Sequence, residues 1–396
     1  PYLKLRMSNK DASNFSPYQL RYWRLIADLI PEGALAKNIN YNYKDTLQAG
    51  EKLNFAIAFK NISDVAFSDS IPLSLKVTNA GGSISTINLP KLKKPLNAGD
   101  TATIVASIDT KDYVGLNTIN LDVNPNSIIP EQYHFNNFLF NNFYVMGDNQ
   151  KPLLDVTFDG VHILNGDIVS AKPNIRIQLK DESKYLSLND TAGIAIQLRY
   201  PDNTVKKFKY GTDTLKFIPP SNVSSDNSAI AELTPTLTQD GEYELTVNGK
   251  DRTGNLTANH DFTVTFNVNN KPMISEVFNY PNPFTTSTAF VFTLTGSTLP
   301  SNIRIQILTV TGKIVKEINK NELGPIRIGR NITEYKWDGT DMYGQKLGNG
   351  VYLYRIITND ANGNSLEKFD IKDSYGDKIQ TGKYFKGGYG KMYLMR

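Results

Sequence analysis

Few side chains in this chain of 396 residues are of the types that catalyse reactions. Cysteine is absent, which excludes disulfides, thiolate metal sites and a cysteine nucleophile within these residues. The histidines, His134, His162 and His260, lie far apart in the sequence, so there is no HExxH or histidine-rich metal motif. No Ser-His-Asp set can be built around them either. We therefore expect no catalytic residue, no metal site and no cofactor in this chain.

One short segment has residue types that suit calcium. Asp338-Gly339-Thr340-Asp341 places carboxylates around a flexible glycine. The spacing is not that of an EF-hand loop, so we favour a plain turn. Paired carboxylates can also hydrolyse glycosidic bonds, but that chemistry needs a defined separation that a sequence does not give.

The end of the chain is basic. No acidic residue follows Asp377, and five basic residues do: Lys378, Lys383, Lys386, Lys391 and Arg396. Residues 271–396 hold seventeen Lys and Arg against eleven Asp and Glu, a net +6, whereas the rest of the chain carries −2. Such a tail is either a solvated terminal hairpin or a surface that docks on an acidic partner by charge and strand-edge pairing.

The elements that must position these residues are strands. Hydrophobic residues make up 40% and charged residues 21%, which excludes wholesale disorder. The net charge of +4 is too small for a general nucleic-acid binder, and the apolar runs are far shorter than the roughly 18 residues of a membrane-spanning helix. No secretory signal opens the chain, and its start at Pro1 indicates a processed protein or part of a longer one. The 21 Tyr, 19 Phe, 28 Gly and 19 Pro favour strands separated by turns, which predicts an all-β fold of tandem Ig-like β-sandwiches.

Breaks in the pattern divide the chain into a connecting segment, 1–33, and three sandwiches, 34–147, 148–270 and 271–396. In the connecting segment Ser16 is a possible cap for a short helix that begins at Pro17 and runs to Ile26. Leu20, Trp23 and Ala27 would share one face of it, which we expect to pack on a neighbouring domain.

Apolar residues that alternate with period two predict the strands of the three sandwiches. The expected strands are 53–59, 71–77, 102–106, 117–123 and 138–145; then 153–158, 174–179, 193–200, 229–233, 241–249 and 262–268; and finally 290–294, 303–310, 314–318, 331–337, 351–358 and 391–395.

Residues 34–147 resemble the CARDB family of bacterial Ig-like modules. The phrases that carry this are FKN after the first long strand, then LNAGDTATI, and finally DVNP and PEQYHFNN at the close. The resemblance implies an adhesion or spacer module. In the next sandwich, DGEYELTVNGKDRTGN is typical of bacterial extracellular Ig-like domains.

Residues 271–396 carry the most specific pattern. Tyr280-Pro281-Asn282-Pro283-Phe284 is followed by Gly312-Lys313, by WDGTDMYG from Trp337 and by GVYLYR from Gly350. In this order the motifs resemble the C-terminal sorting domain of type IX secretion cargo in Bacteroidetes, and the related Ig-like domain of the flagellar hook-cap protein. Trp337 and Tyr352 are expected in the core rather than at a binding surface.

Two longer phrases extend the resemblance to nearly the whole chain. SPYQLRYWRLIADLIPEGAL at 16–35 and KPLLDVTFDGVHILNGDIVSAKPNIRIQLKDES at 151–183 resemble the region downstream of the catalytic domain in PorU-like proteins. These are gingipain-type cysteine peptidases that act as the type IX sortase. The closing GYGKMYL resembles the same subgroup. Since this chain has no cysteine, the resemblance implies a catalytic domain upstream of Pro1.

The resemblance implies the non-catalytic C-terminal region of a type IX component at the cell surface, exported through the periplasm. This region would space the peptidase from the membrane and dock on an outer-membrane barrel, a PorV-like shuttle or the translocon. The sorting and docking residues would be Tyr280, Pro281, Asn282, Pro283, Phe284, Lys383, Lys386, Lys391, Met392 and Leu394. The alternative is an exported cell-surface adhesin or carbohydrate-binding β-sandwich array that is type IX secretion cargo. Rows of exposed aromatic residues on one sandwich face would favour it.

Two further expectations concern the surface. Met392 and Leu394 should face the core and Lys391 and Tyr393 the solvent, and the last strand should offer an open edge to a partner. The resemblance to exported Bacteroidetes proteins also implies O-linked glycans where Asp-Ser or Asp-Thr precedes a small or aliphatic residue in a loop. The acceptors would be Thr46, Ser70, Thr101, Thr191 and Thr214.

Overall fold

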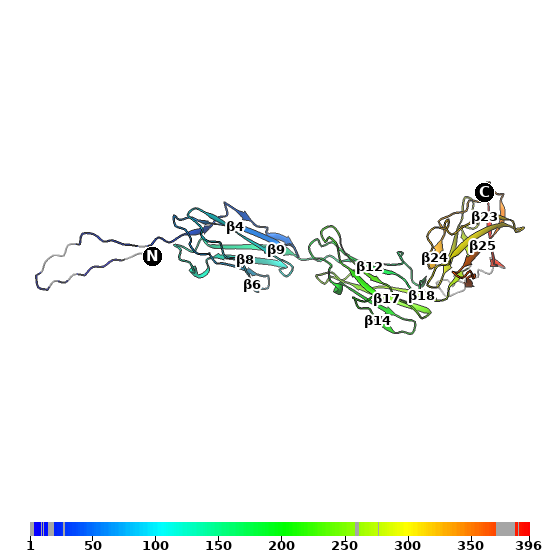
Figure 1. Cartoon of the computed structure of the whole chain (residues 1–396), viewed down its shortest axis with the longest axis horizontal. Helices are drawn as coiled ribbons and strands as arrows, with labels where there is room; N and C mark the ends of the chain where they lie inside the picture. Colours follow the sequence, from blue (N-terminus) through cyan, green and yellow to red (C-terminus); the bar gives the residue numbers. More distant parts are fainter. Residues whose placement is uncertain are drawn as a thin grey trace. The chain divides into compact units, whose positions relative to one another are not determined.

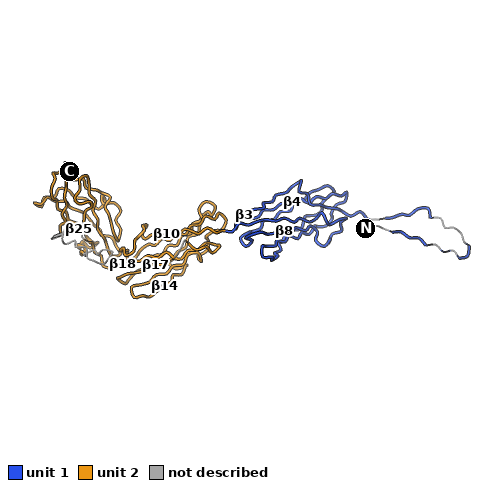
Figure 2. Tube along the Cα trace, turned by 180° about the vertical axis from the view of Figure 1, so that it is seen from behind, with its two compact units in different colours: residues 1–147 blue, residues 148–396 orange. Residues whose placement is uncertain are grey.

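The protein is all-β in the part of the chain that the computed structural model describes, as the composition predicts (Figure 1). The described residues are 4–8, 10, 12–14, 20–26, 28–257, 261–275, 277–369, 385–386 and 388–396, with the backbone alone for 369, 385 and 386. The chain divides into unit 1, residues 1–147, and unit 2, residues 148–396 (Figure 2). The expected division at 270/271 falls inside unit 2, between the sheets of two sandwiches.

The short helix expected over 17–26 does not form in the residues that are described. Ser16, Pro17 and Ala27 lie outside them, and 20–26 have no regular secondary structure. Leu20 and Trp23, the two members of the expected apolar face that are described, are both about half exposed and are not buried against a domain. A helix of this length is marginal in water without such packing, which accounts for the wrong prediction.

Unit 1 contains one β-sandwich. One sheet has the order β1-β4-β2 with β7 paired to β4, and the other has the order β3-β9-β8-β5-β6. The alternation predicted for the first long strand is confirmed, because Leu53, Phe55, Ile57 and Phe59 are all buried on one face of it. The elements are β1 Gly33–Leu35, β2 Tyr41–Asn42, β3 Thr46–Gln48, β4 Leu53–Asn61, β5 Leu73–Thr78, β6 Ile84–Ile87, β7 Thr101–Ile108, β8 Gly115–Val123, the 3₁₀ turn η1 Pro125–Ser127 and β9 Phe138–Met146.

The first sandwich of unit 2 packs the sheet β10-β12-β16-β15 against the sheet β11-β18-β17-β13-β14. Its strands lie within a residue or two of the expected ones, and short extra strands complete the sheets. The elements are β10 Leu153–Phe158, β11 Asp167–Val169, β12 Ile175–Asp181, the 3₁₀ turn η2 Thr191–Gly193, β13 Ile194–Arg199, β14 Val205–Lys207, β15 Leu215–Ile218, β16 Asn227–Leu233, β17 Gly241–Gly249 and β18 Phe262–Val268.

The second sandwich of unit 2 has the sheets β20-β21-β19-β26, with β24 paired to β21, and β23-β22-β25-β28-β27. The strand expected over 331–337 is too long, because Thr333 leaves the ladder and its hydroxyl bonds the backbone of Phe290 and Tyr335. The strands are β19 Met273–Ser275, β20 Phe278–Tyr280, β21 Ala289–Leu294, β22 Asn302–Thr309, β23 Ile314–Ile318, β24 Gly329–Ile332, β25 Gly350–Asn359, β26 Glu367–Phe369, β27 Phe385–Lys386 and β28 Tyr389–Leu394.

The two sandwiches of unit 2 touch through backbone. The Ala171 amide donates to the Gly296 carbonyl at 3.3 Å. Gly329 has φ +97°, and a Cβ added there would lie 2.5 Å from the Ile168 carbonyl oxygen. A side chain at position 329 therefore does not fit without moving one sandwich from the other.

Candidate functional site

The turn that begins at Tyr280 is fixed by buried polar side chains. The carbonyl of Pro281 accepts hydrogen bonds from the Asn279 amide at 3.2 Å and from the Thr288 hydroxyl at 2.8 Å. Asn279 and Thr288 are both buried, whereas the Tyr280 side chain is 72% exposed. The sequence motif thus forms a rigid loop that carries one aromatic ring to the surface.

Asn282 joins this turn to the last strand, β28. Its side-chain amide donates to the Lys391 carbonyl at 3.0 Å, and its side-chain oxygen accepts from the Tyr393 amide at 2.9 Å. Further along, the Phe284 amide donates to the Tyr393 carbonyl at 3.0 Å, and its carbonyl accepts from the Met395 amide at 2.9 Å. The expectation of an open edge on the last strand is therefore wrong for 391–395, because the turn already occupies that edge.

The inward residues of the motif are part of the core. Phe284 packs on Trp337 with ring centroids 5.6 Å apart, and Trp337 packs edge-on against Tyr352 at 5.5 Å. Met392 and Leu394 are buried beside them, which confirms the predicted facing of the last strand and the core position of Trp337 and Tyr352. Phe284, Met392 and Leu394 therefore hold the sandwich together and offer a partner no surface.

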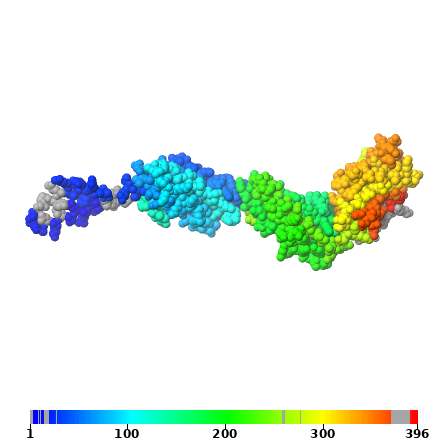
Figure 3. Space-filling model, in the orientation of Figure 1, coloured from blue at the N-terminus to red at the C-terminus, as the bar shows by residue number. Residues whose placement is uncertain are grey.

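The outward residues of β28 are Lys391 and Tyr393, and both are exposed. Part of this final segment, coloured red, is visible on the face of the molecule shown in Figure 3. Of the other basic residues after Asp377, Lys378 and Lys383 lie outside the described residues, and only the backbone of Lys386 is described. The docking role of Lys383, Lys386 and Lys391 stays a prediction.

The Arg396 side chain is hydrogen-bonded to the sandwich and does not extend freely into solvent as part of the basic tail. Its guanidinium donates to the carbonyls of Asp338 and Leu347. Its backbone exchanges two hydrogen bonds with the Asn349 side chain, at 2.9 and 3.1 Å. The end of the chain is thereby fixed to the loop that carries the WDGTDMYG motif.

That loop is a turn held by its own carboxylates. Asp338 accepts from the Thr340 amide and hydroxyl, and Asp341 accepts from the amides of Tyr343 and Gln345. Burial opposes ionisation of Asp338, but the bonds from Thr340 and the charge of Arg396 lower its pKa overall. The segment thus forms a turn in which the carboxylates of Asp338 and Asp341 accept hydrogen bonds from its own backbone.

The expected glycan acceptors differ in exposure. Thr46, Thr101 and Thr191 are exposed, whereas Ser70 and Thr214 are half-buried. All five lie at strand starts, turns or loops, as expected. Glycosylation itself stays a prediction.

The histidines within the described residues each contact an aspartate. His134 lies 3.0 Å from Asp122 and also bonds the Val123 carbonyl, and His162 lies 2.7 Å from Asp155. His260 lies outside the described residues. That the chain has no catalytic set stays a prediction.

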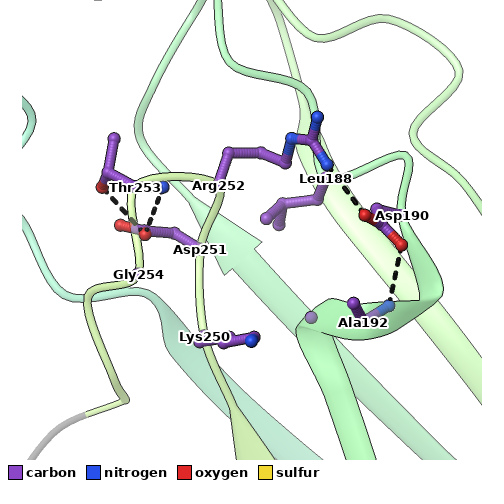
Figure 4. Close-up of a pocket in the computed structure, with 9 residues that line it drawn as sticks. Leu188, Asp190, Ala192, Lys250, Asp251, Arg252, Thr253 and Gly254 are labelled. Carbon is purple, nitrogen blue, oxygen red and sulfur yellow. Dashed lines mark hydrogen bonds and ion pairs between the residues drawn. The ribbon is translucent and has the colours of Figure 1, made fainter. Parts of the chain in front are cut away.

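Two regions of the structure have features that the sequence does not predict. One is a cavity of about 240 Å³ in the first sandwich of unit 2, where Arg252 bonds Asp190 at 2.9 Å and Asp251 bonds Thr253 (Figure 4). Next to it, Asp251 forms a cluster with Asp148 and Asp181. The other is a row of exposed aromatic rings on β9, formed by Phe138, Phe140 and Tyr144. Alternate positions on one strand would have revealed that row.

Comparisons with known proteins give matches among solved structures. No family model matches, and no curated protein matches. The chain is similar to dimeric latent PorU from Porphyromonas gingivalis, with 16% identity over 92% of this chain and 34% of that chain, and a TM-score of 0.24. It is also similar to a CARDB domain from Pyrococcus furiosus solved with di-metal ions, with 12% identity over 31% of this chain and 100% of that one, and a TM-score of 0.25.

The chain is also similar to a β-glucosidase from Listeria innocua, with 16% identity over 30% of this chain and 16% of that chain, and a TM-score of 0.23. The chain spans about a third of the length of PorU. In the described residues no helix is long and apolar enough to cross a membrane.

Proposed function

We propose that this chain is the non-catalytic C-terminal region of a type IX secretion component at the cell surface, resembling the PorU sortase. Its first two sandwiches space a peptidase from the membrane, and its last sandwich docks on an outer-membrane barrel of the system. The observation that carries the proposal is the bonding of the Tyr280–Phe284 turn to the last strand. Two motifs more than 100 residues apart form one structural feature: the turn resembles type IX sorting domains, and the closing strand resembles the end of PorU-like proteins.

The geometry restricts how this feature can dock. Since Asn282 and Phe284 occupy the edge of β28, a partner meets side chains rather than free backbone groups. The side chains that the turn and strand direct outward are Tyr280, Lys391 and Tyr393. Two aromatic rings and a cation suit an acidic partner surface, and charge steering of such a contact weakens with salt.

A test uses charge removal that spares the core. Lys383, Lys386 and Lys391 are replaced together by Gln, and a control replaces three exposed lysines of the same sandwich: Lys313, Lys336 and Lys346. Each protein, carrying the same export signal, is produced in a Bacteroidetes host with or without the translocon. Surface exposure is then measured by protease accessibility, and binding to the purified shuttle barrel at increasing salt.

We expect the tail variant to fold, to stay inside the outer membrane and to lose the salt-dependent part of binding, while the control behaves as wild type. If the tail variant reaches the surface and binds with unchanged salt dependence, the docking role of the tail is wrong. If wild type reaches the surface without the translocon, the type IX assignment is wrong.

One observation favours the alternative, an adhesin or carbohydrate-binding array. Phe138 and Phe140 stack with ring centroids 6.3 Å apart on the exposed face of β9, and Tyr144 is exposed on the same face beyond Asn142. Exposed aromatic rings are platforms for apolar or sugar surfaces, and contiguous apolar patches often mark interaction sites. Glycan-array binding by wild type that is lost in a Phe140→Ala, Tyr144→Ala variant, but kept when exposed Val105 on the other sheet becomes Ala, would support this function.

A further inference from the structure

Three aspartates from distant positions meet in the first sandwich of unit 2. Asp148 precedes β10, Asp181 ends β12 and Asp251 follows β17. One carboxylate oxygen of each lies within 4.8 Å of the others. Like charges at this separation repel, so the arrangement needs a compensating proton or cation.

The cluster is buried and incompletely bonded. Asp181 is 4% exposed and Asp251 6%, and Asp148 is half-buried. Within the described part of the chain, Oδ1 of Asp181 and Oδ2 of Asp148 are buried and have no hydrogen-bond donor. A buried carboxylate oxygen without a hydrogen-bond donor is costly in free energy. Two of them in one cluster point to a bound species that both oxygens can coordinate.

Other contacts position Asp148 and Asp251 and leave these oxygens without a donor. Asp251 accepts from the amides of Thr253 and Asn255, both at 2.8 Å. The Asn255 side-chain amide links the Asp251 carboxylate, at 2.8 Å, to the Asp148 carbonyl, at 3.0 Å. The other oxygen of Asp148 accepts from the Gln150 amide at 3.0 Å. The segments that carry Asp148 and Asp251 are therefore hydrogen-bonded to each other without an ion.

No lysine or arginine of the described residues forms an ion pair with this cluster. Arg252 is adjacent to Asp251 in sequence, but its guanidinium turns to Asp190 (Figure 4). The cluster thus faces an excess of negative charge that the protein itself does not neutralise.

We propose that Asp148, Asp181 and Asp251 bind a divalent cation, and that the cation is calcium. All donors are oxygens, which favours calcium, magnesium or manganese over zinc or copper. Two oxygens bound to one calcium at about 2.4 Å can be no more than about 4.8 Å apart, and all three meet this limit. The ligands come from three separate segments, and such irregular sites suit calcium, which tolerates varied geometry, better than magnesium, which demands an octahedron.

The bound ion would attach the first residues of unit 2 to the end of β12 and to the loop after β17. Calcium would therefore stabilise unit 2 against unfolding, because an ion that binds only the folded state shifts the equilibrium toward it. The sites of extracellular modules have dissociation constants of roughly 10⁻⁴–10⁻³ M, so millimolar calcium is the relevant range.

The test is calcium binding by the full chain after removal of metal with a chelator. Titration calorimetry and thermal unfolding are measured with calcium and, separately, with magnesium, each to about 10 mM, which is ten times the weakest of those constants. Asp181→Asn and Asp148→Asn remove one charge each at constant shape. Asp190→Asn is the matched control, since Asp190 lies beside the cavity but outside the cluster.

We expect wild type and the Asp190→Asn variant to bind calcium and to melt at higher temperature with it, and both cluster variants to lose this response. Asp181→Asn should melt no lower than wild type in chelator, because it removes a buried charge. The proposal is overturned if wild type shows neither heat nor a melting shift with calcium, or if Asp181→Asn keeps the full response. A response to magnesium alone overturns the choice of calcium. A wild type that is stabilised only by acid identifies a shared proton and also overturns it.

Discussion

Replacing Asn282 with Ala tests whether the turn and the last strand form one feature. The change removes two hydrogen bonds, to the Lys391 carbonyl and from the Tyr393 amide. A hydrogen bond contributes about 0.5–1.5 kcal/mol net, so the two together give roughly 1–3 kcal/mol. Since Asn282 is exposed and water can replace part of the loss, we expect the low end, about 1–2 kcal/mol.

Phe284→Ala provides the upper reference. Phe284 is 2% exposed and packs on Trp337, so its truncation leaves a cavity in the core. Such changes cost about 3–5 kcal/mol. The order expected for the loss of stability is therefore Phe284→Ala, then Asn282→Ala.

The chain supplies its own reporter for this sandwich. It has two tryptophans, and in a Trp23→Phe background only Trp337 remains. Trp23 is half exposed in the N-terminal segment, whereas Trp337 is 0% exposed and its indole donates to the Thr340 carbonyl at 2.8 Å. Guanidinium unfolding followed by the fluorescence of Trp337 thus reports on the sandwich that contains the motif.

Asn321→Ala is the control, since Asn321 is exposed and makes no side-chain hydrogen bond in the described structure. Surface substitutions of this kind stay within about 0.5 kcal/mol. If Asn282→Ala falls in the same range, the turn does not hold the last strand and our account of the motif is refuted.

Three other predictions follow from particular contacts. Gly329→Ala should lower the melting temperature of unit 2 and speed proteolysis at 269–272, because the new Cβ would meet the Ile168 carbonyl. A rate of proteolysis equal to that of wild type would contradict this. Burial raises the pKa of Glu131 above its ordinary 4.5, so the folded state binds this proton more tightly than the unfolded state does. The stability of unit 1 should therefore fall as pH rises through the folded-state pKa, and Glu131→Gln should remove this fall. Pulse proteolysis in urea measures the stability of unit 1 at each pH. Protein from the native host should be heavier than the bare polypeptide, with modified peptides around Thr46, Thr101 and Thr191 before Ser70 and Thr214, and an intact mass equal to the polypeptide would refute glycosylation.

Most long strands could be predicted because a sandwich buries one face of each. In β4 the apolar residues Leu53 to Phe59 recur at every second position, and in β17 Tyr243, Leu245 and Val247 do the same, a pattern that indicates a half-buried strand. Strands of two or three residues, such as β2 and β27, are too short to show a period and were missed. The N-terminal helix was predicted from caps and spacing alone, and these do not replace the packing that stabilises a helix.

The candidate site could be predicted in part. Local chemistry identifies Tyr280–Phe284 as a fixed turn and Met392 and Leu394 as inward, because proline restriction and strand alternation are local effects. The bond from Asn282 to Lys391 spans 109 positions, and its partner depends on which strand reaches the edge. For the same reason the sequence does not predict the aspartate cluster, because its members lie 33 and 70 positions apart and form no motif.

The closed edge also decides which experiment can distinguish docking from folding. Removing 387–396 deletes Met392 and Leu394 from the core, and it also deletes the residues of β28 and Met395 that hydrogen-bond Asn282 and Phe284. Loss of export after that deletion would therefore follow from unfolding alone. Changes at Lys391 and Tyr393 leave the core and the backbone ladder intact, because these side chains point outward while their backbone groups bond the turn. A defect in export that appears with those outward changes, in a protein whose Trp337 unfolds as in wild type, can only come from the surface.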